Sequence, residues 1–438
     1  MTANGLNPTR RVLDNGVTVI VKANHTTPAV SLLVGVRAGA YSDPIDREGT
    51  AALCARVLDR GTVTRPADVI ADDLDGRGAS LSVVTGRHQM AIGATCLSDD
   101  FGAVLTLAAD IARAPAFADA EVNTRRADLI TSIRQDEDNP APMAVDAFER
   151  ALYGSHPYAR KIRGRVASVD RISRQDLARF YQEGFRPDAV TVVVVGDVAE
   201  DAAVAAIETA FGDWKPTRGD KPSGLSVGGE AAPVPDVVTP TERRLVTVPM
   251  MNKAQADLAY GFVGIRRSHP GYTAYSVMNN ALGQYAIGGR LGDRIRERQG
   301  MAYYVFSSLD ASLGAGPFTI RAGVSADNVE RAIASIDAEL TTVRQFGLTA
   351  QEVDESKSYL IGSLPRQLET NAAIASFLLT TEFFDLGLDY DVRLPGLIES
   401  VTLDAANAAA RHLLDPARAT IAVAGPWQPV AADTQGRR

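Results

Sequence analysis

The chain has 438 residues, of which 45% are hydrophobic and 22% are charged, and its formal net charge at pH 7 is −8. This length accommodates two or more domains with cores of their own, and the composition is ordinary for a globular protein. The acidic balance argues against nucleic acid or an anionic membrane surface as the main partner, and no apolar run is long enough to predict a membrane span.

The first half of the chain opens with β-structure and continues mainly as helices. Residues 12–21 alternate around Asn15-Gly16, a pair typical of the tight turn of a β-hairpin. The other expected elements, in chain order, are a strand (30–37), a helix (49–58), a helix closed by Gly76 and Gly78, paired strands (81–84 and 89–95), a largely helical stretch (99–181) with a helix from about 167 to 183, and a strand (189–195).

The second half repeats this order, which indicates an internal duplication. Phe117-Ala-Asp-Ala-Glu-Val introduces a helix in the first half, and Leu348-Thr-Ala-Gln-Glu-Val introduces one in the second. The elements expected here are a strand (256–262), two helices (272–282 and 289–298), paired strands (303–312 and 318–324), helices to about residue 414 and a last strand (419–424). Strands grouped before and between helices predict an α+β fold of two homologous halves, each an antiparallel sheet packed with helices.

A segment rich in proline and glycine separates the two halves. Residues 216–241 show no apolar periodicity, which is typical of a spacer rather than a helix or strand. The sequence therefore predicts an N-terminal half (1–215), a linker (216–241) and a C-terminal half (242–438). Such a linker would let the halves face each other as a clamshell.

The stretch Gly49-Thr-Ala-Ala-Leu-Cys-Ala-Arg-Val-Leu-Asp-Arg-Gly-Thr62 resembles the zinc-binding segment of the pitrilysin/insulinase family, the inverzincins. In that family a helix carries the signature H-x-x-E-H, entered through Gly-x-Ala and left through Leu-x-x-Gly-Thr. The resemblance places Ala52 and Arg56 at the two histidines and Ala55 at the glutamate. It also places Ser132 at the third ligand, a glutamate of the family, before the acidic run that ends at Pro140.

None of these four residues is a usual zinc ligand, because zinc takes imidazole, thiolate or carboxylate groups. The methyl groups of Ala52 and Ala55 have no lone pair, and the guanidinium of Arg56 is a permanent cation without an acceptor. The hydroxyl of Ser132 is not a plausible replacement for a carboxylate. Positions i, i+3 and i+4 share one helix face, so the frame of a metal site is kept while its chemistry is lost. We expect this chain to bind no metal.

A second segment of the family is matched in the C-terminal half. The run Gly288-Gly-Arg-Leu-Gly-Asp-Arg-Ile-Arg-Glu-Arg-Gln-Gly-Met-Ala-Tyr-Tyr-Val305 resembles the family segment in which a helix ends at Arg-x-x-x-Gly-Leu-Ala-Tyr and leads into a strand. The resemblance implies that Arg296 and Tyr303 reach an active site formed by another half. There a guanidinium and a phenol can stabilise negative charge on a carbonyl oxygen or hold the substrate backbone. The residues alone leave open a plain charged helix face, with Arg290, Arg294 and Arg298 beside Arg296.

The resemblance implies the non-catalytic subunit of a bacterial two-subunit zinc metalloendopeptidase. A homologous partner with an intact H-x-x-E-H would bind the zinc, while this chain would complete the partner's active site and help to bind unfolded peptides. Three alternatives remain open: a purely structural member like the core proteins of respiratory complexes, a standalone peptide-binding protein, and a standalone enzyme that uses the acidic cluster Asp136-Glu137-Asp138.

Location and thiol chemistry are less constrained by the sequence. Paired bacterial relatives are often exported, so we expect the periplasm, with the cytoplasm as the alternative, although the first residues show no secretion signal. The two cysteines, Cys54 and Cys96, form no disulfide framework, and no two of the five histidines have metal-ligand spacing.

Overall fold

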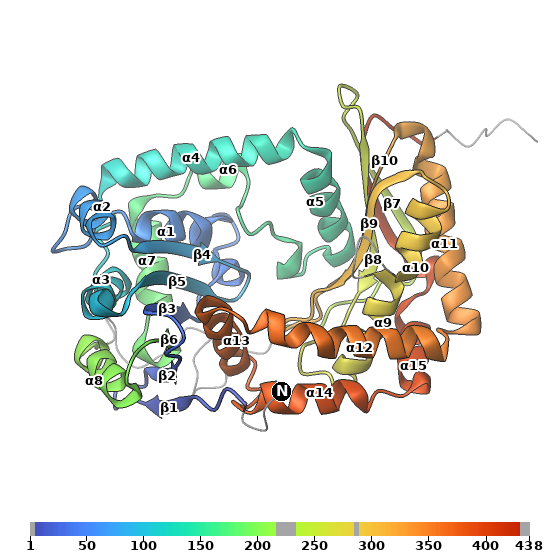
Figure 1. Ribbon diagram of the computed structural model, residues 1–438. Helices are drawn as coiled ribbons and strands as arrows, with labels where there is room; N and C mark the ends of the chain where they lie inside the picture. The colour runs from blue at the N-terminus through green and yellow to red at the C-terminus, as the bar shows by residue number, and fades with distance from the viewer. Residues whose placement is uncertain (1–4, 216–233, 284–288, 430–438) are drawn as a thin grey trace, which may run out of the picture. The chain divides into compact units, whose positions relative to one another are not determined.

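The computed structural model describes residues 5–215, 234–283 and 289–429, which form two compact units (Figure 1). Unit 1 contains residues up to Arg134, 160–234 and 361–396; unit 2 contains residues 135–159, 235–360 and 397 onward. Most of the expected linker, at 216–233, lies outside the described residues, and residues 234–241 form neither helix nor strand.

Unit 1 is built on a six-stranded sheet with the order β1-β2-β6-β3-β5-β4. The strands are β1 (Thr9–Val12), β2 (Thr18–Ala23), β3 (Ala29–Val36), β4 (Ser80–Thr85), β5 (Met90–Leu97) and β6 (Val190–Gly196). Strand β2 runs parallel to β6, and the other neighbours are antiparallel. The expected hairpins are confirmed: β1 pairs with β2 around Gly16, which has φ +94°, and β4 pairs with β5.

Unit 2 repeats this topology with five strands in the order β7-β11-β8-β10-β9. These are β7 (Arg244–Pro249), β8 (Ala256–Val263), β9 (Ala302–Leu309), β10 (Pro317–Val324) and β11 (Thr420–Gly425). Strand β7 is parallel to β11, as β2 is to β6, and all remaining pairs are antiparallel. The same order and the same directions in both sheets confirm the α+β fold with two homologous halves.

The helices of unit 1 cover both faces of its sheet. One face shares a hydrophobic core with α1 (Thr50–Leu58), α3 (Phe101–Arg113), α7 (Arg174–Gly184) and α8 (Glu200–Phe211). The buried side chains of Val192 and Val194 point from β6 into this core. Val193 and Val195 point the other way and meet Leu378 of α13 (Asn371–Phe383). The remaining helices of this part of the chain are α2 (Ala67–Gly76), α4 (Asp119–Glu137) and α6 (Val166–Val169).

The two halves of the sequence exchange a helix. Helix α5 (Pro140–Tyr153) lies in the sequence between β5 and β6 of the first sheet, yet it packs on β8, β11 and β7 of unit 2. Helix α13 comes from the C-terminal part of the chain, yet it packs on β3 and β6 of unit 1 (Figure 1). The expected boundary near residue 215 therefore does not coincide with a single division between the compact units.

Unit 2 also contains α9 (Tyr272–Gly283), α10 (Gly289–Leu291), α11 (Val329–Phe346) and α15 (Leu403–Leu413), while α12 (Ala350–Gln367) and α14 (Tyr390–Glu399) span the limits between the units. Two expected helices differ in detail. The helix from 167 to 183 is interrupted, because Ser173 caps α7 through a hydrogen bond from the amide of Asp176. The helix over 289–298 consists of α10 followed by a π-helical turn, Gly292–Glu297. No helix in the described ranges combines the length and apolar character needed to cross a membrane.

Candidate functional site

Helix α1 carries the positions that correspond to the zinc signature, and its start is set by a buried carboxylate. Gly49 precedes the helix with φ +97°, and a Cβ there would lie 2.7 Å from the carbonyl oxygen of Arg163. The two oxygens of Asp43 accept hydrogen bonds from the amides of Gly49 (2.7 Å) and Ala51 (2.8 Å). Burial raises the pKa of Asp43 to about 7, against the lowering effect of these two hydrogen bonds.

The three signature positions do lie on one helix, as expected. Ala52 and Ala55 are buried, with 5% and 4% of their surface exposed, and Arg56 is half-buried. Within the described residues, the Arg56 guanidinium makes no hydrogen bond or ion pair. In the described part of the chain it is therefore a cation without a counterion, at the position that the resemblance aligns with a histidine ligand of the family.

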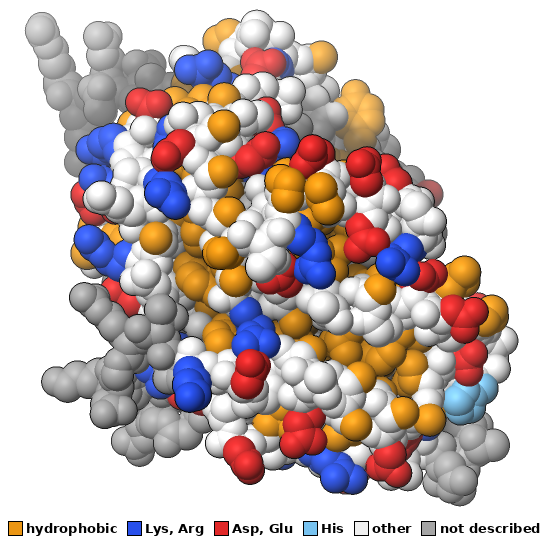
Figure 2. All heavy atoms as spheres, turned by 90° about the vertical axis from the view of Figure 1, so that its left-hand side faces the viewer, with side chains coloured by type: hydrophobic (Ala, Val, Ile, Leu, Met, Phe, Trp, Pro, Cys, Tyr) orange, Lys and Arg blue, Asp and Glu red, His pale blue; other side chains and the backbone are white. Residues whose placement is uncertain are grey.

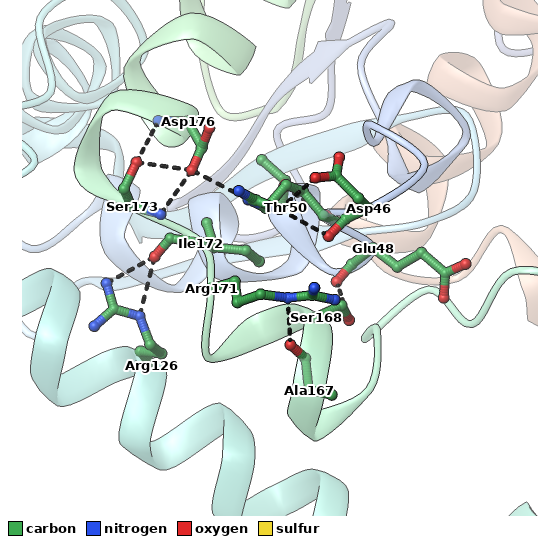
Figure 3. A network of polar contacts seen from close by, with 11 residues as sticks. Asp46, Glu48, Thr50, Arg126, Ala167, Ser168, Arg171, Ile172, Ser173 and Asp176 are labelled. Atoms are coloured by element: carbon green, nitrogen blue, oxygen red, sulfur yellow. Dashed lines mark hydrogen bonds and ion pairs between the residues drawn. The ribbon is translucent and has the colours of Figure 1, made fainter.

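Ser132 lies on α4, half-buried, and its hydroxyl oxygen accepts a hydrogen bond from the guanidinium of Arg163 at 3.2 Å. A second guanidinium therefore occupies the surroundings of the third ligand position. Helix α4 is fixed by Arg126, which donates two hydrogen bonds to the carbonyl oxygen of Ile172 (Figure 3).

A network of polar contacts connects the segment around Ile172 to helix α1 (Figure 3). The hydroxyl of Ser168, on α6, donates to the carbonyl oxygen of Glu48 at 2.8 Å, just before α1 begins. Asp176 closes the capping box of α7 with Ser173 and lies 3.6 Å from Arg47. Because α1, α4, α6 and α7 are joined in this way, the helices that carry the four positions aligned with the zinc signature are held together by contacts that need no metal.

The side chains at this scaffold do not fit zinc. Two methyl groups, a guanidinium and a hydroxyl that receives a hydrogen bond from another guanidinium offer no ligand set, and the cations would repel a metal dication. No group of three or more His, Cys, Asp or Glu side chains in the described ranges is arranged to hold a metal ion.

Arg296 lies in the π-helical turn Gly292–Glu297 of unit 2. Single π-helical turns are rare and are found frequently at functional sites. The arginines around it have long-range or cross-turn partners: Arg290 binds Glu339 and Glu352, Arg294 binds Glu339 at 2.9 Å, and Arg298 binds Asp293 at 2.8 Å. Arg296 pairs only with its neighbour Glu297, at 2.5 Å, among the residues that the structure describes. The four arginines are therefore not equivalent members of one charged face.

Tyr303 lies on the edge strand β9 at an irregularity of the sheet. Tyr304 is opposite Gly323 and Ala302 is opposite Val324, so Tyr303 has no counterpart on β10. This one-residue excess is a β-bulge, a feature that redirects side chains and is common beside active sites. The Tyr303 side chain is 71% exposed, and no hydrogen bond to it is found in the described part of the chain.

The structure thus places Arg296 and Tyr303 on consecutive elements of unit 2, each at a local departure from regular geometry. It shows no hydrogen bond between their side chains in the described part of the chain. The acidic cluster at 136–138 lies at the end of α4, where the 72% exposed Asp138 pairs with Lys253 at 2.7 Å.

Three buried carboxylates near these sites were not predicted. Asp43 caps α1, Glu339 binds Arg290 and Arg294, and Asp257 accepts a hydrogen bond from Tyr304. Asp257 and Glu339 are distant in sequence from the residues that they hold. The only available signal was an acidic residue within an otherwise apolar strand or helix face, which does not identify the partner.

Two family models match the chain. The model described as insulinase, peptidase family M16, matches residues 18–165, and the model described as peptidase M16 inactive domain matches residues 171–360. The first match includes α1 and Ser132, and the second includes Arg296 and Tyr303.

The relatives cover almost the whole chain. An uncharacterised zinc protease of Mycobacterium tuberculosis is 28% identical over 431 residues, covering 97% of this chain and 94% of that protein. The uncharacterised zinc protease YmxG of Bacillus subtilis is 26% identical, covering 82% and 84%.

Two solved structures share the fold with a TM-score of 0.87 and cover 97% of this chain and all of theirs. They are a peptidase M16 inactive domain from Pseudomonas fluorescens, with 24% identity, and a protease from Helicobacter pylori, with 16% identity. At these identities they establish the common architecture only. Together with the two family models and the duplicated sheets, they show that this chain belongs to the insulinase family of peptidases, family M16.

Proposed function

We propose that this chain is a non-catalytic subunit that completes the active site of a homologous zinc metalloendopeptidase. The observation that carries the proposal is an asymmetry within the chain. The helix scaffold of the first half is intact but holds Ala52, Ala55 and Arg56 at its signature positions, while the second half presents Arg296 and Tyr303. The ligands have been lost from one half, and the residues that would serve a partner have been kept in the other.

The chemistry of the two residues suits that role. A guanidinium and a phenol hydroxyl donate hydrogen bonds to a peptide carbonyl oxygen, and such donors act most strongly when negative charge develops on that oxygen. Arg296 has no long-range counterion in the described ranges, and Tyr303 is largely exposed, so both are available to another molecule. A cation held by a distant carboxylate, like Arg294, would be much less available.

The substrate class follows from the sheet edges. Strand β4 pairs only with β5, and strand β9 pairs only with β10, so each sheet ends in a strand with one unpaired edge in the described part of the chain. Extended peptides bind such edges through main-chain hydrogen bonds, with little dependence on side-chain identity. Unfolded peptides are therefore the substrates we propose for the assembled enzyme.

The face shown in Figure 2 does not favour a nucleic acid partner. In the face shown in Figure 2, Lys and Arg side chains are interspersed with Asp and Glu and do not collect into one basic stripe. A basic stripe is the usual electrostatic feature of nucleic-acid-binding proteins.

The test uses the chain co-purified with its natural partner. The isolated chain is expected to hold no zinc and to cleave no unfolded peptide, whereas the pair should contain zinc and show activity. Arg296→Ala and Tyr303→Phe should each lower kcat of the pair by about a hundredfold or more with zinc content unchanged, since loss of one oxyanion donor costs about 2.7–4 kcal/mol.

Arg298→Ala is the matched control, because Arg298 lies in the same segment but its side chain is 71% exposed and pairs with Asp293. Its activity should stay within about twofold of the unchanged pair, as expected for a surface ion pair. Full activity of both the Arg296 and the Tyr303 variants would refute the proposed role. Activity of the partner alone, equal to that of the pair, would favour a purely structural member of the family.

A further inference from the structure

The bulge at Tyr303 is held from within the sheet by a buried carboxylate. Asp257 on β8, Gly323 on β10 and Tyr304 on β9 are opposite one another across three neighbouring strands. Gly323, in the middle, has no side chain, and the phenol of Tyr304 reaches across it to donate a hydrogen bond to the Asp257 carboxylate. Gln255 donates to the same carboxylate, with its amide nitrogen 3.3 and 3.2 Å from the two oxygens.

The glycine is required by this arrangement. A Cβ at position 323 would lie 2.6 Å from Cε1 of Tyr304 and 2.4 Å from Nε2 of Gln255. Any other residue would have to displace one of the two donors. Asp257 is 3% exposed, and a buried carboxylate is costly unless it is hydrogen-bonded, so the native sheet favours the conformation in which both donors are in place.

The position of the contact relative to the bulge gives it a consequence for Tyr303. The extra residue, Tyr303, lies between two residues of β9 that each have a partner on β10: Ala302 is opposite Val324, and Tyr304 is opposite Gly323. Fixing the Tyr304 side chain to Asp257 fixes which residue is the extra one. A shift of one residue would reverse the faces to which neighbouring side chains point.

We propose that Gln255, Asp257 and Tyr304 form a latch that positions Tyr303, by holding the bulge so that the Tyr303 phenol remains outside the sheet and available to the partner subunit. The role of this latch in activity rests on the proposed function, whereas its effect on the structure of the bulge does not. Tyr304 and Asp257 are positioning residues, since they act through Tyr303.

Burial and the hydrogen bond to Asp257 raise the pKa of Tyr304 above its ordinary value. The phenol therefore keeps its proton, and remains a donor to Asp257, throughout the pH range in which peptidases are assayed.

The structural part is tested on the isolated chain by hydrogen exchange of the peptides that cover β9 and β10. Tyr304→Phe removes only the hydroxyl and should speed exchange at residues 303–305 by roughly tenfold or more, because a hydrogen bond to a buried carboxylate is lost. Tyr260→Phe is the matched control: Tyr260 is on β8, three residues from Asp257, and its hydroxyl donates at 2.8 Å to Asp337 of helix α11 and not to a residue beside the bulge. It should leave exchange at 303–305 unchanged. Equal exchange in the Tyr304 variant and the unchanged chain would overturn the latch.

The functional part is tested on the pair with a double-mutant cycle. If Tyr304 acts through Tyr303, Tyr304→Phe should lower kcat with zinc content unchanged, and adding it to Tyr303→Phe should cause no further loss. Additive losses would show that Tyr304 acts by another route and would overturn the positioning role. If Tyr303→Phe alone has no effect on activity, the proposed function fails at this residue, while the exchange data still decide whether the latch exists.

Discussion

Replacing Asp43 by asparagine is expected to remove a pH dependence from the stability of helix α1. Burial raises the pKa of this carboxyl from 3.8 to about 7 in the folded chain. Between these values the folded state holds a proton that the unfolded state has released, so this group stabilises the fold at low pH, and its contribution falls as pH rises through 7. At 1.36 kcal/mol per pKa unit, the contribution is about 2 kcal/mol at pH 5.5 and close to zero at pH 8.

The measurement is the opening free energy of the α1 amides by hydrogen exchange, with intrinsic rates corrected at each pH. The unchanged chain should lose about 2 kcal/mol of protection relative to Asp43→Asn between pH 5.5 and 8. The comparison with the variant cancels other titrations, such as that of His88, whose pKa is lowered by burial to about 4 and which acts in the opposite direction. Asp46→Asn, which alters a largely exposed carboxylate nearby, serves as the charge control. Parallel pH profiles for the unchanged chain and Asp43→Asn would refute the reasoning.

Two further predictions concern the positions aligned with the zinc signature and the buried ion pair between Arg290 and Glu339. The zinc signature is restored by four changes, Ala52→His, Ala55→Glu, Arg56→His and Ser132→Glu. The isolated chain with all four should bind zinc stoichiometrically, which calorimetry can detect. The chain with the other three changes but with arginine kept at position 56 should bind none. Glu339→Gln should leave Arg290, whose side chain is only 9% exposed, without its buried counterion, and lower the stability of unit 2 by about 3–5 kcal/mol in denaturant titrations. Unchanged stability would mean that the neighbouring Glu352 suffices.

Local sequence patterns were enough to predict the pairs of strands that are adjacent in sequence, and the duplication. The Asn15-Gly16 turn and the paired runs around Thr85 and Gln89 bring together segments that are close in sequence, so the pattern that forms each strand also indicates its partner. The repeated glycines at Gly196 and Gly425 end equivalent strands, β6 and β11, in both sheets.

Long-range packing could not be predicted in this way. Helices α5 and α13 have no feature that identifies which of two similar sheets each one covers, because both sheets offer an apolar face of valines and other aliphatic residues. The bulge at Tyr303 depends on Asp257, some 46 residues earlier in the chain by number, and on Gly323 between them. The residue types at the candidate sites were thus readable from the sequence, but the contacts that position them were not.

The exchange of helices has a consequence for how the chain can be divided. A fragment of residues 1–215 contains all six strands of the first sheet but lacks α13, which buries Ile374, Leu378 and Leu379 against it. Burial of each such side chain contributes about 1.5–3 kcal/mol, so their combined loss is comparable with the whole stability of an ordinary domain, about 5–15 kcal/mol. The fragment should therefore bind a hydrophobic dye and melt without cooperativity. The same fragment joined through a flexible linker to residues 361–396 should melt cooperatively and bind little dye. A cooperative melt of residues 1–215 alone would show that α13 is dispensable, and that the first half folds without the helix it receives from the second.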